Sequence, residues 1–334
     1  MVNEKPLTYD YQATKSFLLA NYKKPTGAQL INDLQNTIKL AQKTQTFSET
    51  RYNKRYNLCI SYNNSVNFFK LDAQDGIILS IENCYYDLLC QNIKPVSFST
   101  KVNDYINDQN KADNYYQISG YKKAIDFIKT QFKLSSVSPQ DKMLSQNTNW
   151  VSSCIGVKDS LNPFKNAEYA SEDEYIVLFG TTEPEFDGSI WAQTKKNIEL
   201  GGLPPAVRQN QITKFASLIK AVLLYHKSVS TYSIGPGGLI TGLYKICQKS
   251  NLGIKLDLEK LSNNMTAFDI LLSESSNRFL ACMNKDLLRD LDVIVRGSEI
   301  TKQIIGKTTA DNKNTIEIKD VGTLEIKQNK ANQK

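Results

Sequence analysis

Histidine is almost absent from this chain of 334 residues, and its cysteines are not paired in sequence. His226 is the only histidine, so a metal site or catalytic centre built on several histidines is excluded. The cysteines form no C-x-x-C pair and match no zinc-ligand spacing. We therefore expect His226 to be structural or exposed, and the thiols to be free in a reducing, cytoplasmic compartment. The cysteines are Cys59, Cys84, Cys90, Cys154, Cys247 and Cys282.

Long apolar runs are also missing. No segment approaches the length that spans a bilayer, and no apolar stretch near the start precedes a cleavage-like site. We therefore expect neither a membrane partner nor a signal peptide. The 41 basic and 34 acidic residues leave a mild, scattered net charge of +7. Because nucleic-acid binders usually carry a denser basic run, nucleic acid is not an expected partner.

Apolar periodicity predicts strands alternating with helices, which is typical of an α/β or α+β fold. The length of 334 residues indicates two domains or one large one, with a break over residues 159–173. Strands are expected over 58–62, 66–71, 95–99, 150–157, 175–179, 254–258, 278–283, 291–295, 315–318 and 323–326. Helices are expected over 76–92, 118–132, 212–223 and 239–249, with helical patches over 13–22 and 29–43 in a polar N-terminal segment.

One long stretch contains no acidic residue. Between Leu200 and Leu256 there is neither Asp nor Glu, and within it a glycine-rich turn, Ser233-Ile-Gly-Pro-Gly-Gly-Leu239, precedes a predicted helix. Glycines let the backbone approach a ligand, and a helix N-terminus attracts anions. Phosphoryl transfer, however, usually needs carboxylates that hold magnesium. The turn therefore predicts a site for ATP, ADP or another phosphate without metal ligands. Its candidate residues are Ser233, Gly235, Gly237 and Gly238.

Two further polar segments are candidate binding sites. Gly188 and Ser189 follow a predicted strand, at the kind of strand exit where ligands often bind in α/β folds; the alternative is an ordinary loop. In the segment 273–278, Glu274 could accept from a ligand amine, and Arg278 could pair with a phosphate. The alternative is a turn capped by serine and asparagine, in which Glu274 pairs with Arg278. No residue is assigned a catalytic or metal-binding role.

The order of these segments resembles phosphoribosylformylglycinamidine synthase, of the aminoimidazole ribonucleotide synthase superfamily. The likeness covers about residues 5–328 and is to the second of two tandem synthetase copies. Its most specific element is Leu271-Leu-Ser-Glu-Ser-Ser-Asn-Arg-Phe-Leu280. The other matching segments, in family order, are Leu71–Gly76, Ile155-Gly-Val157, Tyr175–Gly180, Asp187-Gly-Ser189, Gly237-Gly-Leu239 and Ile254–Leu258.

The chain departs from the family where the family binds its metal. The family motif Asp-Val-Ser-Asp-Gly-Gly-Leu falls on Ser233–Leu239, so Ser233 and Pro236 replace both aspartates. The family loop Ser-Gly-Asn-Val-Ser falls near Leu134–Ser138 and loses its Gly-Asn pair. The matching glycines and Glu274 serve mostly backbone geometry and packing. The resemblance therefore implies the family fold without its metal-dependent chemistry.

The resemblance implies a two-domain unit. An N-terminal connecting segment (1–55) precedes an N-terminal half-barrel domain (56–160), a C-terminal α/β domain whose sheet is covered by helices (172–328) and a polar tail (329–334). The half-barrel would pair with a second copy, forming a homodimer, or with a related synthase subunit. Family chemistry is ATP-dependent activation of an amide carbonyl, followed by ammonia attack, in de novo purine synthesis.

Three functional hypotheses follow. The first is a diverged, catalytically inactive binding or scaffold subunit, with no certain cofactor. The second is a functional subunit of a split synthase whose other chains supply the catalytic copy and the glutaminase. The third, from another class, is a nucleic-acid or effector-type interaction protein that uses residues 200–256.

Overall fold

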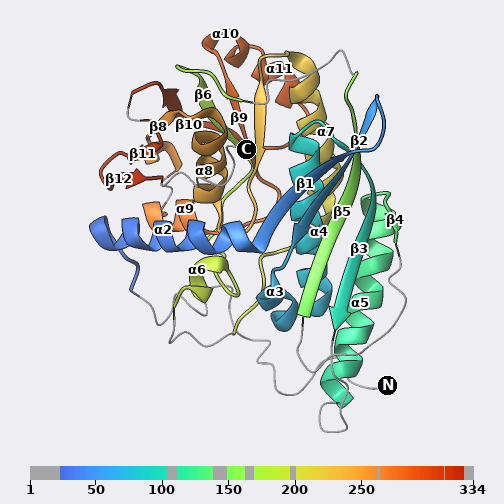
Figure 1. The fold of residues 1–334 in the computed structure, drawn as a ribbon. Helices are drawn as coiled ribbons and strands as arrows, with labels where there is room; N and C mark the ends of the chain where they lie inside the picture. The colour runs from blue at the N-terminus through green and yellow to red at the C-terminus, as the bar shows by residue number, and fades with distance from the viewer. Residues whose placement is uncertain are drawn as a thin grey trace.

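A computed structural model describes residues 23–103, 111–137, 149–161, 169–195, 201–261, 264–311 and 313–326. Its two sheets lie side by side, each with helices packed on it (Figure 1). This arrangement confirms the expected mixed α/β class with two sheets. The helical patch expected over 13–22 and the polar tail at 329–334 lie outside the described residues.

The N-terminal unit is a five-stranded sheet with its helices. The strand order is β1-β2-β5-β3-β4, antiparallel except for the short parallel pair of β3 and β4. Its strands are β1 (Gln45–Arg51), β2 (Tyr56–Asn63), β3 (Lys94–Asn103), β4 (Ser135–Ser136) and β5 (Asn149–Asp159). Its helices are α3 (Val66–Leu71), α4 (Ala73–Cys90) and α5 (Lys111–Gln131).

The C-terminal unit is a seven-stranded sheet of order β12-β11-β8-β10-β6-β9-β7, in which only β8 and β11 pair in parallel. Its strands are β6 (Tyr175–Phe179), β7 (Ser230–Ser233), β8 (Gly253–Leu256), β9 (Phe279–Met283), β10 (Lys302–Thr309), β11 (Thr315–Ile318) and β12 (Gly322–Glu325). Its helices are α6 (Ile190–Gln193), α7 (Gln209–Tyr225), α8 (Leu239–Ser250), η2 (Glu259–Leu261), α9 (Ala267–Leu272), α10 (Lys285–Leu288) and α11 (Leu291–Val295).

Both faces of β6, in the C-terminal sheet, are buried. Side chains alternate across a strand, so Ile176 and Leu178 of β6 enter one apolar core. Val177 and Phe179, on the opposite face, enter the other. This double burial explains why β6 reads as a continuous apolar run rather than as an alternating one.

Helix α4 joins the two units. Its start is capped by Asp72, whose side chain accepts a hydrogen bond from the Asp75 amide. One side of the helix packs on β2, β3 and β5, and the other contacts α7 and β7. Its apolar residues belong to the same core as Phe179 of the C-terminal sheet. Because protein surrounds α4 in this way, its acidic residues Glu82 and Asp87 are buried as well.

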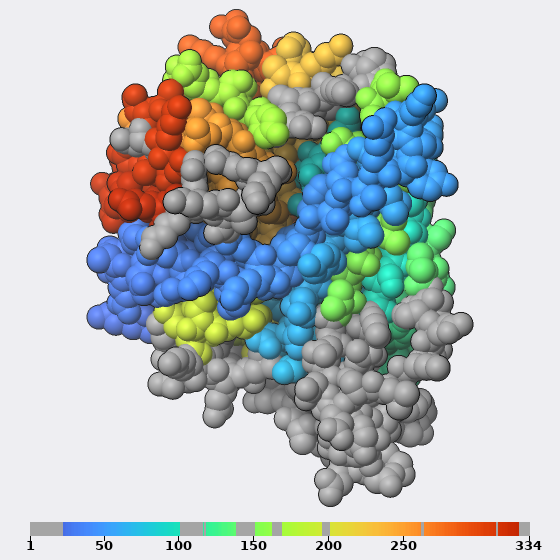
Figure 2. Space-filling view, viewed as in Figure 1, coloured from blue at the N-terminus to red at the C-terminus, as the bar shows by residue number. Residues whose placement is uncertain are grey.

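Helix α2 (Gly27–Thr44), which confirms the patch expected over 29–43, packs on the C-terminal unit. Leu30 and Leu34 lie in that unit's core, and Asp33 is also buried. The Asp33 carboxylate accepts from the Trp191 indole at 3.0 Å and pairs with Lys195 at 2.6 Å. Strand β1 follows at once and pairs with β2, so this segment runs from one unit to the other (Figures 1 and 2).

Two predicted strands are wrong, because both segments are short helices. In α3, Phe68, Phe69 and Leu71 are buried on one side, and a six-residue apolar run does not distinguish a helix from a strand. In α11 only Leu291 is buried, whereas Val293 is 66% exposed. Strands β1, β4, β7 and β10 are not predicted from the sequence, since each is partly or wholly polar. The other expected strands and the four expected helices are present.

The exposed histidine and the free thiols are as expected, while the cytoplasmic compartment stays a prediction. His226 is exposed just after α7, where its Nδ1 lies 2.7 Å from the Ser228 hydroxyl. All six cysteines are free and buried. In the part of the chain that the structure describes, no helix combines the length and apolar character that crossing a membrane requires.

We predict that α2 is essential to the C-terminal core. Leu34→Ala, at a side chain with 0% exposure, should lower the free energy of unfolding by about 3 kcal/mol through lost burial and a cavity. The neighbouring exposed change Gln35→Ala should stay within about 0.5 kcal/mol of wild type. Urea denaturation of both variants measures this difference. Equal stabilities would contradict the packing of α2.

Candidate functional site

The glycine turn connects β7 to α8 and is buried throughout. Gly237 and Gly238 have φ values of 87° and 76°, which disfavour residues with a side chain. The Gly238 amide donates to the Gly235 carbonyl at 3.1 Å, and the Thr241 hydroxyl donates to the Gly238 carbonyl at 2.8 Å. The predicted tight turn at a helix start is therefore present.

The space beside the turn is filled by the chain's own groups. A Cβ added to Gly237 would lie 2.5 Å from the Thr241 methyl group and 3.1 Å from the Ala41 Cβ of α2. One added to Gly238 would clash with the Ser273 carbonyl oxygen. At Gly235 it would clash with the side-chain amide of Gln45. A side chain at any of these three glycines would therefore collide with atoms of the same chain.

Glu274 supplies an internal anion at the turn. Its carboxylate accepts from the Ile190 amide at the start of α6, at 2.5 Å, and also from the Gly237 amide. Burial raises the pKa of the Glu274 carboxyl to about 7, against the opposing effect of these two amides. The backbone donor expected to bind a ligand anion is thus used by a carboxylate of the same chain.

Ser233, at the other end of the turn, belongs to a buried ionic network. Its hydroxyl donates to the Asp87 carboxylate at 2.6 Å, and Ser61 donates to the second oxygen at 2.9 Å. The Lys245 ammonium lies 3.3 Å from Asp87 and 2.9 Å from the Ser233 hydroxyl. Burial acts to raise the pKa of Asp87, but Lys245 and the two hydroxyls hold it below its ordinary value. A fixed ammonium therefore neutralises this carboxylate.

Arg278 is 1% exposed and turned into its own loop. Its guanidinium donates to the carbonyls of Ser273 and Ser275 and to the Thr182 hydroxyl. Burial lowers its pKa to about 10. These contacts are those of the capped turn that is the alternative to a ligand site in segment 273–278. Glu274, however, accepts from backbone amides and does not pair with Arg278.

Gly188 and Ser189 also have internal contacts. Gly188 has a φ of 72°, and a Cβ there would lie 2.9 Å from Leu71. The Ser189 hydroxyl caps α6 by accepting from the Ala192 amide at 3.2 Å. The structure thus brings Ser189, Gly237, Gly238 and Glu274 together, while Ser233 faces Asp87 instead. Their role as ligand-binding residues stays a prediction.

Sequence reasoning missed the polar partners on α4 and α7. Asp87 and Glu82 lie within the apolar stripe of α4. Acidic residues inside an apolar stripe were the one sequence signal that pointed to buried polar partners. Arg208, at the start of α7, pairs with Glu185 at 3.1 Å and Glu183 at 3.2 Å. Lys214, also from the acid-free stretch, pairs with Glu299. Within the described residues, no cluster of three or more His, Cys, Asp or Glu is arranged to hold a metal ion.

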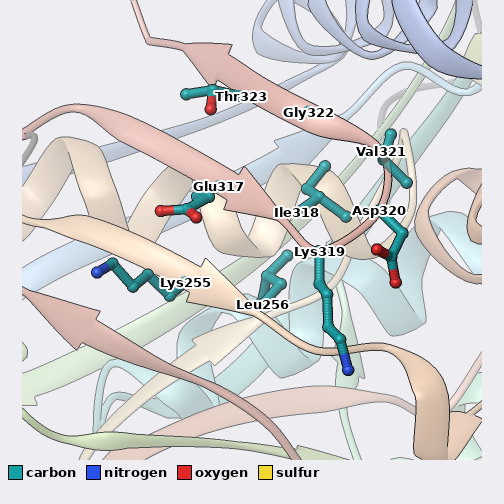
Figure 3. A pocket seen from close by; sticks show the side chains of 9 residues that line it. All are labelled: Lys255, Leu256, Glu317, Ile318, Lys319, Asp320, Val321, Gly322 and Thr323. Carbon is teal, nitrogen blue, oxygen red and sulfur yellow. The ribbon is translucent and has the colours of Figure 1, made fainter.

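A surface depression of about 520 Å³ lies elsewhere, beside β8, β11 and β12 (Figure 3). Lys255 and Glu317 stand on adjacent strands there, and Lys319 lies at the end of β11. Lys319 pairs with Asp257 at 3.2 Å and Glu259 at 3.0 Å. No predicted site residue lines this depression, so we do not assign it to the site.

Comparison with known proteins agrees with this fold. Residues 172–319 match the family described as AIR synthase related protein, C-terminal domain. The structure of Thermotoga maritima PurL complexed with FGAR superposes with a TM-score of 0.64 at 13% identity, covering 90% of this chain and 53% of that one. Thiamine-monophosphate kinase from Stenotrophomonas maltophilia gives a TM-score of 0.52 at 13% identity, covering 89% and 98%. These likenesses show an AIR synthase-like fold.

Curated relatives narrow the assignment. The phosphoribosylformylglycinamidine synthase subunit PurL of Corynebacterium ammoniagenes is 24% identical over 307 residues, which are 88% of this chain and 39% of the relative. That of Tropheryma whipplei is 30% identical over 139 residues, which are 41% and 18%. The C-terminal part of the chain matches the AIR synthase related family, and the chain as a whole is PurL-like in sequence and fold, which confirms the resemblance. It spans less than half the length of these curated relatives.

We predict that the turn's glycines are structurally required. Gly238→Ala should destabilise the protein by about 4 kcal/mol, because strain at positive φ adds to a clash with fixed backbone. Gly297→Ala is the matched control, since Gly297 has a φ of 81° but nothing within 4 Å of an added Cβ. The control should lose only about 1–2 kcal/mol. Equal losses in denaturant titrations would show that the turn is not tightly packed.

Proposed function

We propose that this chain is a non-catalytic subunit of the PurL-like class that acts as a scaffold for a related synthase domain. The observation that carries this proposal is the internal occupation of the glycine turn. The Glu274 carboxylate accepts a hydrogen bond from the Gly237 amide. Gln45 packs beside Gly235, and α2 packs beside Gly237. No residue in the stretch between Leu200 and Leu256 replaces the two aspartates of the family motif.

Bound nucleotide is the main point to test. Thermotoga maritima PurL has been solved with ATP and with ADP, at 15% identity to this chain. An added phosphate would meet the Glu274 carboxylate at the turn, and repulsion between like charges disfavours that position. Lys245, a possible phosphate partner, is already held by Asp87 and Ser233. These contacts support a scaffold over a phosphotransferase.

The outward face of the N-terminal sheet supports pairing with another domain. Leu58 and Tyr62 of β2 are each 39% exposed, and Val151 of β5 is 41% exposed. Ile60 and Ile155 face each other between them, only partly buried by described residues. An apolar centre of this kind is typical of a protein interface, and its edge carries the ion pair Arg55–Asp159.

A related synthase subunit is the proposed partner. The solved assembly PurLQS of Thermotoga maritima contains a chain that superposes on this one with a TM-score of 0.60, at 15% identity. A homodimer through the same face is the other form that the pairing could take. The pairing face consists of the outward-facing apolar residues of β2 and β5, which are Leu58, Ile60, Tyr62, Val151 and Ile155.

A functional subunit of a split synthase is the second candidate. The fold supports it, because 91% of this chain superposes on half of a chain from the Thermotoga maritima PurLQS assembly. A separate chain carrying the other synthetase copy would then supply the missing catalytic residues. Mixing the two purified chains with glutamine, ATP and the formylglycinamide substrate distinguishes the candidates, since only a split enzyme gains activity from this chain.

We predict that the purified chain alone neither hydrolyses ATP in a magnesium-dependent way nor gains melting temperature from ATP or ADP. A ligand that binds only the native state would raise that temperature. Thermotoga maritima PurL is the positive control. Magnesium-dependent hydrolysis that persists through purification and disappears in Ser233→Ala would refute the scaffold proposal.

We predict that Tyr62→Glu abolishes pairing without unfolding the chain. A buried carboxylate in an apolar interface costs several kcal/mol, whereas the same residue facing water costs little. Leu224→Glu, at an exposed apolar residue of α7 outside the pairing face, is the matched control and should leave pairing intact. Analytical ultracentrifugation of the chain alone and with a co-expressed synthase subunit measures this. A wild-type chain that stays monomeric in both would contradict the pairing.

A further inference from the structure

Glu82 is buried between the two units with only half of its carboxyl group bonded. It lies in the middle of α4 and is 1% exposed. One oxygen accepts from the Asn277 amide at 2.9 Å. The other, Oε2, has no hydrogen-bond partner among the residues that the structure describes. Neither the glycine turn nor the pairing face uses this residue.

The contact of Glu82 with Asn277 is a direct polar link from α4 to the C-terminal unit. Asn277 has a φ of 56°, and its side chain accepts from the Tyr86 hydroxyl at 2.6 Å. Tyr86, one turn along α4, therefore holds the same loop as Glu82. The loop runs directly into β9, which pairs with β6 and β7 in the C-terminal sheet.

The charged groups around Glu82 do not neutralise it. Arg208 is the nearby cation, but its guanidinium is held by Glu183, Glu185 and the Ser276 hydroxyl. Glu185 is a second buried carboxylate and repels a negative charge on Glu82. Tyr86 contributes a neutral hydroxyl, and the adjoining face of α7 is apolar. An ionised Glu82 would thus be an unpaired buried charge, which costs far more than a neutral carboxyl group.

We propose that Glu82 and Asn277 form a proton-dependent joint between the two units, which holds while Glu82 is neutral and loosens when Glu82 ionises. The neutral group keeps the carbonyl oxygen that accepts from Asn277 and removes the buried charge. The ionised group gains stability from hydration, which it reaches only if α4 separates from the loop. The proton itself is the regulating ligand.

The direction of the pH dependence follows from the carboxyl group. Burial raises the pKa of Glu82 from 4.5 to about 7, with the Asn277 amide and Arg208 opposing and Glu185 adding to the shift. A group with a raised pKa in the folded state stabilises fully below its unfolded pKa, and this stabilisation is lost as the pH rises to the folded pKa. The joint should therefore weaken between about pH 4.5 and pH 7 and then stay constant.

The test compares wild type with Glu82→Gln, which keeps the shape and the acceptor but cannot ionise. Hydrogen exchange of the segment 273–278 should lose protection in wild type by up to about ten-fold per pH unit between pH 5 and 7, after correction for intrinsic exchange rates. In Glu82→Gln the protection should not change with pH. Glu183→Gln, a carboxyl group in the same cluster with 43% side-chain exposure, is the matched control and should behave as wild type.

Two outcomes would overturn the joint. One is equal pH dependence of the protection in wild type and Glu82→Gln. The other needs only the wild-type chain, so it holds even if the variant does not fold. In a carbon-13 titration of the glutamate carboxyl groups, Glu82 and Glu274 should both titrate near pH 7. The absence of any carboxyl resonance titrating above pH 6 would remove the proposal.

Discussion

The burial of α4 between two sheets is the constraint on which the rest of the structure depends. A helix that is covered on all sides must be apolar or must bring partners for its polar groups. Asp87 has such partners in Ser61, Ser233 and Lys245, which come from both units. Among the described residues, Glu82 accepts a hydrogen bond only from the Asn277 backbone amide. The packing that creates one core across both units therefore buries two carboxyl groups. Both oxygens of Asp87 have hydrogen-bond partners, whereas only one oxygen of Glu82 has one among the described residues.

The glycine turn shows how a ligand-binding geometry can be used for packing. Its positive φ values and its place before α8 are those of an anion site, yet Glu274 supplies the anion and α2 supplies the covering surface. Lys245 in turn balances Asp87. The Gly237 amide and the Lys245 ammonium thus both have partners within the chain. This internal satisfaction stabilises the junction of the units and is consistent with a scaffold that retains the fold of a synthase.

The sequence predicted local features well and long-range partners poorly. Apolar periodicity predicted α4, α7 and α8, because each helix repeats apolar residues along the face that it buries. It misassigned α3 and α11, whose six and five residues are too few to show a period. It overlooked β1, because most of its residues are exposed and polar at the sheet edge. The likeness to the synthase family supplied the order of segments but could not show which side chains meet.

By itself, the sequence determined the strand and helix alternation, the tight turn at Gly237 and Gly238, and the absence of acids around it. These properties depend on neighbouring residues and on the backbone angles that glycine allows. Only the tertiary structure decided that Glu274 reaches the turn, that Gln45 and α2 close it, and that Asp87 lies against Ser233. Such contacts join residues far apart in the chain, and they form only when burial of the apolar faces brings the two sheets against α4.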